Sequence, residues 1–180
     1  MCGSTEKKIA GSGLIHTGHE EMAAYLDQAY QLYQDLYIEK YTPFNPNYSL
    51  DFFQWSYKSG FIRYEGYADT VGTLKAFAGM FIYGNTITTP LFGYAIKESV
   101  KKALYTHGAY LTLEYKCITG LPFNGSSGAS RFKSWRGAKP VLEYSLVYCR
   151  HLALRTRLIV RFLAWLSNGV GRWLLVKYEL

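Results

Sequence analysis

The feature of this 180-residue sequence that most constrains its fold is a run of three extended segments separated by turns. The first segment, FIRYEGYA (Phe61–Ala68), alternates apolar and polar residues, which is the pattern of a half-buried strand. After a turn at Asp69–Gly72, the segments Leu74–Gly84 and Thr86–Ile96 follow, and Gly84-Asn85 between them is typical of a hairpin turn. The run therefore predicts three antiparallel strands.

Helical patterns lie on both sides of this run. Apolar residues recur at three- and four-residue steps over Glu20–Lys40, and a second helix is predicted from Leu50 to Lys58 with Ser49 as its N-cap. A third helix is predicted over Lys97–Cys117. This order of elements predicts an α+β fold in which helices flank a mixed, mostly antiparallel sheet.

Shorter patterns follow in the last third of the chain. Leu121–Ser127 predicts a short strand that runs into a loop of small residues, and SRFKSWRGA predicts one short helix. Pro140–Cys149 alternates and predicts a further strand. Leu152–Leu180 predicts a basic amphipathic helix, with Arg157 and Arg161 on a narrow polar stripe. This helix either packs on the core or lies on an anionic membrane surface.

The composition is that of one ordered domain with an anionic partner. Hydrophobic residues make up 49% of the chain and charged residues 18%, which excludes a disordered protein. The formal charge of +7 favours a phosphorylated ligand, a nucleic acid or an anionic membrane. The three cysteines lie far apart, so we expect no metal site, no disulfide framework and a cytoplasmic location. We expect a poorly ordered segment without a signal peptide over residues 1–18, the domain over 19–150 and the tail over 151–180.

Three stretches of the sequence resemble the GNAT acyltransferases, and in particular their FemAB-like branch, which acylates amines from acyl-CoA or aminoacyl-tRNA. They are YIEKYTPFNPNYSLDFFQW (37–55), FAGMFIYGNTITTPLFGY (77–94) and GASRFKSWRGAKPVLEY (128–144). The last is similar to the Phe-Lys-x-x-x-Gly turn of that branch. Because many FemAB-like proteins carry two copies of the fold, the resemblance implies a C-terminal half or a minimal version.

Two places depart from the GNAT pattern. Classical members hold the CoA pyrophosphate on an Arg/Gln-x-x-Gly-x-Gly/Ala loop, and the corresponding GYAIKESVKK here lacks those glycines. The segment SGLIHTG is a poor substitute for the usual first strand. The first departure leaves the donor open, and both favour a version of the fold without catalysis.

The resemblance also implies where an acyl donor binds. In GNAT folds the acyl chain lies between the fourth and fifth strands, which map here to Thr86–Ile96 and Leu121–Ser127. Pro90 predicts either a bulge that opens this cleft or a device that blunts an edge strand. The small polar loop after the fifth strand either binds the donor or is a plain turn. The residues assigned to donor binding around the cleft are Thr88, Thr89, Asn124, Ser126 and Ser127.

The remaining candidate residues are charged or aromatic. Lys133 and Arg136 lie three apart in the predicted short helix, so they either bind donor phosphates or form a solvated basic turn. Lys133 is the residue on which the family resemblance falls. Glu143 is a candidate base that points either into the cleft or to solvent, and Tyr94 is either a proton donor or part of the sheet packing. We predict Glu143, Lys133 and Tyr94 as the catalytic set.

Two classes of function follow from the resemblance. The first is an N-acyltransferase that moves an acyl group by direct transfer from acetyl-CoA, a longer acyl-CoA or aminoacyl-tRNA. Its acceptor would be an amine-bearing small molecule or a cell-envelope precursor. The alternative is a non-catalytic module with the same fold that binds a protein, or the inner face of a membrane through the C-terminal helix. Nucleic acid is expected only as the tRNA of such a donor.

Overall fold

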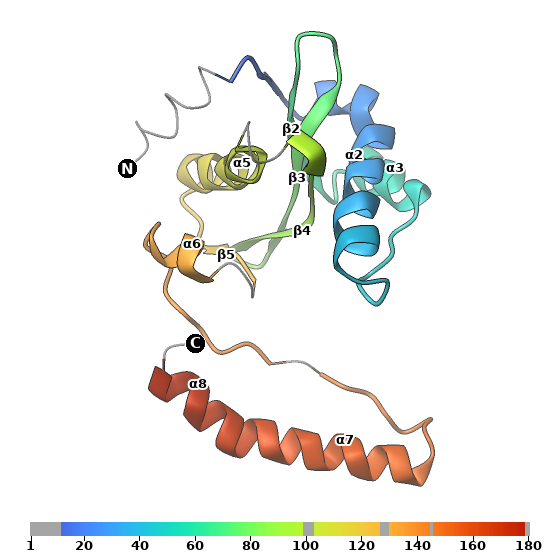
Figure 1. The fold of residues 1–180 in the computed structure, drawn as a ribbon, viewed down its shortest axis with the longest axis vertical. Coiled ribbons are helices and arrows are strands. Elements are labelled where there is room, and N and C mark those ends of the chain that lie inside the picture. Colours follow the sequence, from blue (N-terminus) through green and yellow to red (C-terminus); the bar gives the residue numbers. More distant parts are fainter. Residues whose placement is uncertain (1–11, 99–102, 127–129, 145, 179–180) are drawn as a thin grey trace. The chain divides into compact units, whose positions relative to one another are not determined.

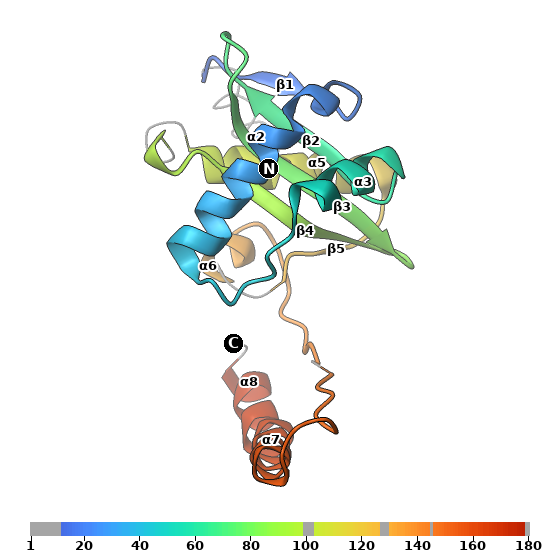
Figure 2. The ribbon, with the colours of Figure 1, turned by 90° about the vertical axis from the view of Figure 1, so that its right-hand side faces the viewer.

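The computed structural model describes residues 12–98, 103–126, 130–144 and 146–178. The chain divides into two compact units, Met1–Ser126 and Ser127–Leu180. In the first unit a five-stranded sheet lies between helices on its two faces (Figures 1 and 2). This is the predicted α+β architecture.

The sheet of the first unit has its strands in chain order. Its members are β1 (Ile15–Thr17), β2 (Arg63–Ala68), β3 (Leu74–Tyr83), β4 (Thr86–Tyr94) and β5 (Phe123–Asn124). Neighbours pair antiparallel except β4 and β5, which are parallel. The three strands predicted between residues 61 and 96 are confirmed as β2, β3 and β4. The turn between β2 and β3 forms as predicted, because Asp69 Oδ1 accepts hydrogen bonds from the N–H groups of Val71 and Thr73.

The first strand is present, contrary to the prediction from SGLIHTG. Ile15 lies opposite Ala68, and Thr17 lies opposite Gly66 on β2. The strand has only three residues, which is too short for an alternating pattern to stand out in the sequence. Its backbone pairing with β2 defines it instead. Because the first strand is present, the argument against catalysis that rested on a missing first strand no longer applies.

One face of the sheet is covered by the helical segments that precede β2 (Figure 1). They are a 3-10 turn (Glu21–Tyr25), α2 (Leu26–Tyr33), a π-helical segment (Gln34–Tyr41) and α3 (Leu50–Lys58). The two predicted helices of this region are thus confirmed, and α3 has the predicted bounds. Its N-cap is also as predicted, since Ser49 Oγ accepts a hydrogen bond from the Phe52 N–H at 3.2 Å.

The opposite face of the sheet is covered by α5 (Leu104–Thr119). The helix predicted from Lys97 begins later, because residues 96–98 form a separate 3-10 turn and Ala103 adopts a left-handed conformation with φ of 49°. The part of that prediction over residues 99–102 lies outside the described residues. Gly120 ends α5 with φ of 70°, the usual conformation after a helix.

The main core lies between the sheet and the pair α2 and α3 (Figure 2). Phe53, Tyr64 and Phe77 are fully buried there, and the Tyr64 hydroxyl lies 2.8 Å from Ser56 Oγ. On the α5 side, Ala78 and Leu111 pack together with Tyr67. Both faces of the sheet are therefore buried, and this fixes the positions of β3 and β4.

The second unit consists of helices joined by an extended segment. Its helices are α6 (Ser130–Ser134), α7 (Leu154–Leu166), a π-helical segment (Ser167–Gly171) and α8 (Arg172–Tyr178). The short helix and the helical tail are confirmed, whereas the strand predicted over Pro140–Cys149 is wrong for its described residues. An alternating segment becomes a strand only where a neighbouring strand pairs with its N–H and C=O groups. No strand pairs with the described residues of this segment.

Candidate active site

The candidate site of the first unit lies where β4 and β5 part. On β4, Thr88 pairs with Phe81 of β3 and Leu91 pairs with Gly79, so two residues, Thr89 and Pro90, stand opposite the single residue between them. This is a bulge in β4, and the predicted bulge at Pro90 is confirmed. The parallel pairing with β5 ends at the same level (Ile87 opposite Phe123, then Thr88 opposite Asn124).

Four of the residues predicted to bind a donor gather at this point. Thr88 is the last β4 residue that pairs with β5, and it lies opposite Asn124. Thr89 Oγ1 lies 3.3 Å from Thr112 Oγ1 on α5. Asn124 Oδ1 accepts a hydrogen bond from the Ser126 N–H at 2.7 Å, and Ser126 has a left-handed φ of 56°. The asparagine thus holds a tight turn directly after β5. The fifth predicted residue, Ser127, lies outside the described residues.

Three predicted residues belong to the second unit. Lys133 lies in α6, but this helix ends at Ser134, so Arg136 lies in the following turn and does not share a helical face with it, contrary to the prediction. Burial lowers the pKa of the Lys133 ammonium, and the carboxylate of Glu143 acts in the opposite direction. Lys133 and Glu143 therefore interact electrostatically within this unit.

Tyr94 ends β4 as part of an aromatic cluster. Its ring packs edge-on against Phe92 and Tyr105 and is 7% exposed. Burial raises the pKa of Tyr94 to about 12, and the neighbouring Tyr41 hydroxyl contributes. Its hydroxyl therefore stays protonated at neutral pH and can donate a hydrogen bond. Because the deprotonated form is hardly populated at that pH, Tyr94 does not serve as a base.

A buried ionic group on β2 has no counterpart in the sequence-based prediction. Glu65 is 6% exposed, and its carboxylate lies 2.8 Å from Arg63 Nε and 3.5 Å from His16 Nε2. Burial by itself raises the pKa of Glu65, but the hydrogen bonds from His16 and Arg63 outweigh it and lower the pKa. A charged residue inside an otherwise buried strand was the available signal, because buried carboxylates are almost always paired.

His107 completes the polar groups on this face of the sheet. It is 2% exposed, its ring packs edge-on against Tyr67, and its Nδ1 lies 3.0 Å from the Ala103 carbonyl. Its Nε2 is the single buried side-chain nitrogen or oxygen without a hydrogen-bond partner among the described residues. The histidine therefore packs in the core through its ring.

Replacement of His16 by glutamine is expected to remove a pH-dependent part of the stability. The Glu65 hydrogen bond raises the pKa of His16 above 6.5, so its contribution is complete below that pH and declines as the pH rises through the folded-state pKa. The lowered pKa of Glu65 makes its contribution complete above about 4.5 and lost at lower pH. Between these limits the pair stabilises most, and because His16 is half exposed we expect less than about 1 kcal/mol.

Urea unfolding at a series of pH values checks this effect. The wild-type free energy of unfolding should decline between the ordinary pKa of histidine and mildly alkaline pH, and His16→Gln should flatten that decline. His151→Gln, in the second unit, is the control and should leave it unchanged. Equal slopes for wild type and His16→Gln would contradict the ion pair.

The segment after β4 is tied to the turn between β2 and β3. Lys75 Nζ lies 2.7 Å from Glu98 Oε1 and 3.2 Å from Asp69 Oδ2. The lysine is largely buried, and the two carboxylates raise its pKa against the effect of burial. The segment GYAIKESVKK, which corresponds to the pyrophosphate loop of the classical GNAT pattern, continues from here into residues 99–102, which lie outside the described part.

The described residues lack a cluster of metal-ligating side chains and a helix that could span a membrane. None of their His, Cys, Asp and Glu side chains form a group of three that could hold a metal ion. Among the same residues, no helix combines the length and the apolar character needed to cross a membrane.

Comparison with known proteins places the fold. No family model matches the sequence, and no curated protein matches it. Among solved structures, an acetyltransferase of Trypanosoma brucei is similar over 75% of this chain and 99% of its own, with 13% identity and a TM-score of 0.51. A possible acetyltransferase of Clostridium difficile (10% identity, 75% of this chain and 99% of its own) has a TM-score of 0.46. The enzyme AAC(6')-Iy, solved with a CoA-containing bisubstrate analogue, has a TM-score of 0.44 at 10% identity over 75% of this chain and 97% of its own. At these identities the likeness concerns the fold alone, and the chain has the α+β fold of the GNAT acetyltransferases.

Proposed function

We propose that the chain is an N-acyltransferase that transfers an acyl group from acyl-CoA directly to an amine. The observation that carries this proposal is the bulge at Thr89–Pro90, placed where the parallel pairing of β4 and β5 ends. A bulge bends its strand locally, and the extended acyl chain of the donor would lie along β4 where its pairing with β5 ends. The fold supports the same function, since the similar T. brucei protein is an acetyltransferase.

The chemistry asks little of the protein. The amine nitrogen forms a bond to the thioester carbon, the carbon–sulfur bond breaks, and the proton of the amine ends on the CoA thiolate. The carbonyl oxygen gains negative charge on the way, and a backbone N–H can stabilise that charge. The bulge contains Thr89 and Pro90, which lie between the paired residues Thr88 and Leu91. Pro90 has no N–H, so we assign this role to the N–H of Thr89.

The other roles rest on the candidate residues. Asn124 and Ser126 form the turn directly after β5 and would contact the pantetheine amides of the donor. Tyr94, which stays protonated, would act as a hydrogen-bond donor. Lys133, Arg136 and Glu143 belong to the second unit, and their roles in binding donor phosphates and in accepting the amine proton stay predictions from the sequence. The acceptor we propose is an amine-bearing small molecule or a cell-envelope precursor.

The decisive experiment is a donor screen by thermal unfolding. A donor at a hundred times its dissociation constant should raise the free energy of unfolding by about 2.7 kcal/mol. For a chain of this size that corresponds to a rise in Tm of about 5–11 °C. Acetyl-CoA, longer acyl-CoA thioesters and free CoA should be compared, followed by transfer to amines of increasing size. No shift with any thioester would contradict the acyl-CoA donor.

Matched variants assign the donor contacts. Lys133→Ala and Asn124→Ala should each reduce the shift in Tm caused by acetyl-CoA, whereas Lys58→Ala, an exposed lysine on α3, should not. The aminoacyl-tRNA donor of the FemAB-like branch is the other possibility for this site. It would give tRNA binding that weakens steeply with salt, together with no response to CoA thioesters.

A further inference from the structure

The C-terminal helices carry large apolar side chains that have no core to pack in within their unit. The described side chains of α7, the π-helical segment and α8 are all at least partly exposed, and none of them is buried. The large apolar side chains with roughly 40% to 70% of their surface exposed are Leu154, Leu158, Ile159, Phe162, Leu163, Trp165, Leu166, Val170, Trp173, Leu174 and Leu175. Isolated apolar residues on a surface are ordinary, but a continuous set of this size marks a binding surface.

Most of the large apolar residues of α7 fall on one half of the helix, whereas Val160 falls on the other. At 100° per residue, seven of them fall within a single half-circle, and we call this the apolar side of α7: Leu154, Leu158, Ile159, Phe162, Leu163, Trp165 and Leu166. Arg157 and Arg161 fall on the opposite half. Arg155 lies among the apolar residues in the first turn, where its long side chain can reach a polar boundary. A helix divided in this way has one side for a nonpolar medium and one for water.

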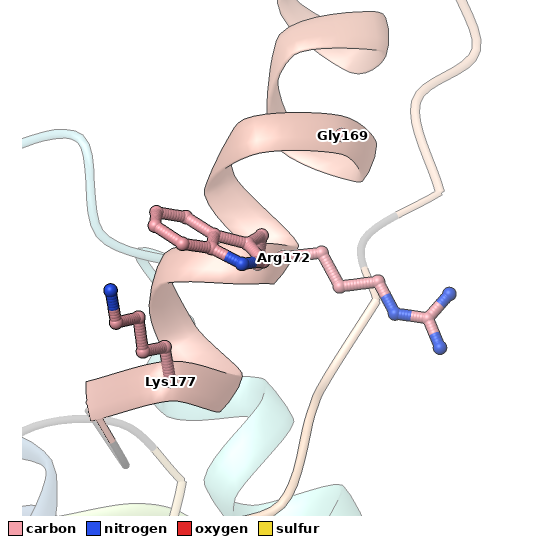
Figure 3. Close-up of a pocket in the computed structure, with 4 residues that line it drawn as sticks. Gly169, Arg172 and Lys177 are labelled. Carbon is pink, nitrogen blue, oxygen red and sulfur yellow. The ribbon is translucent and has the colours of Figure 1, made fainter.

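The charges on these helices have one sign. From residue 144 to residue 178 every Asp, Glu, Lys or Arg is basic: Arg150, Arg155, Arg157, Arg161, Arg172 and Lys177. On α8, Lys177 Nζ lies 4.6 Å from the centre of the Trp173 ring. Figure 3 shows Arg172 and Lys177 extending in different directions from this helix, beside a shallow hollow that they line with Gly169 and Trp173. Basic residues thus accompany α7 as far as Arg161 and stand again on α8, with none between Phe162 and Gly171.

The chemistry of this surface selects one kind of partner. A groove on a protein takes a narrow strip of anchoring side chains at three- and four-residue steps, whereas this apolar side spans half of α7. A nucleic acid would satisfy the arginines and leave the apolar side in water. A bilayer with anionic headgroups accepts both, because apolar side chains enter the acyl region while arginines meet phosphates. We propose that α7 and α8 lie along the surface of an anionic membrane.

Vesicle flotation with the full chain tests this proposal. The protein should float with vesicles that contain phosphatidylglycerol in phosphatidylcholine, and should stay in solution with vesicles of phosphatidylcholine alone. Arg157→Ser/Arg161→Ser should lower the partition coefficient about 25-fold, at about fivefold for each arginine. Leu158→Ser/Phe162→Ser should lower it about a hundredfold or more, because two large side chains no longer enter the bilayer.

A control of equal charge separates this surface from the net charge of the chain. Lys58→Ser/Lys116→Ser removes two exposed positive charges from the first unit and should reduce flotation less than twofold. Equal losses in this control and in Arg157→Ser/Arg161→Ser would overturn the proposal. Failure to float with anionic vesicles would overturn it too, and would favour an acidic protein or the chain's own domain as the occupant. Donor binding is read separately by thermal unfolding, so either proposal can fail alone.

Discussion

Replacement of Phe53 by alanine is expected to lower the free energy of unfolding by about 3–5 kcal/mol, the largest single effect we predict on stability. Phe53 lies in α3, is fully buried, and packs between α2 and the sheet. Its ring centre lies within 6.2 Å of the ring centres of Tyr30, Tyr33, Tyr64 and Phe77. Alanine would leave a cavity that these aromatic rings cannot fill without leaving their own contacts.

The measurement is urea unfolding of Phe53→Ala beside Phe44→Ala. Phe44 is 94% exposed, so its replacement should change the free energy of unfolding by less than about 0.5 kcal/mol. For a chain of this size, the loss at Phe53 should lower Tm by about 6–20 °C. A loss at Phe53 as small as that at Phe44 would mean that α3 does not pack on the sheet as described.

The elements that the sequence predicts well are those whose signals are local. Ser49 caps α3, Asp69 and Gly84 stand in the hairpin turns, and the strands between them alternate over enough residues to be recognised. The bulge at Pro90 belongs to the same class, because proline lacks the N–H that continuous pairing requires. From Pro90 the sequence predicts the position of the bulge, which lies where the pairing of β4 with β5 ends.

The elements that the sequence does not predict depend on partners distant in the chain. β1 exists because Ile15–Thr17 finds β2, and Pro140–Cys149 has the strand pattern without a strand beside its described residues. The sequence can mark Glu65 as a buried carboxylate, but its partner His16 is identified only by the pairing of β1 with β2. Likewise, the shared face assigned to Lys133 and Arg136 needed a helix longer than α6. Tertiary pairing, not propensity, decides the cases of β1, Pro140–Cys149 and Glu65.

Replacement of Gly93 by alanine is expected to lower the free energy of unfolding by about 3 kcal/mol, because a rigid neighbour leaves no room for a methyl group. Gly93 lies on β4, directly under α2. A Cβ atom there would lie 2.9 Å from the backbone carbonyl carbon of Leu32 and 2.7 Å from Cε1 of Phe77. The backbone of α2 cannot move without shifting the whole helix, so the strain must separate α2 from the sheet.

The matched variant is Gly108→Ala on α5, which tests whether a rigid neighbour matters. A Cβ at Gly108 would lie 2.6 Å from Cε2 of Phe92, but that ring is partly exposed and can turn aside. Alanine also favours the helix over glycine by about 1 kcal/mol, so the net loss at Gly108 should be below about 1 kcal/mol. Urea unfolding of both variants decides the point, since equal stabilities would show that α2 does not lie against β4. Because β4 also carries the bulge at Thr89–Pro90, a displaced α2 should reduce the stabilisation by acetyl-CoA in Gly93→Ala but not in Gly108→Ala.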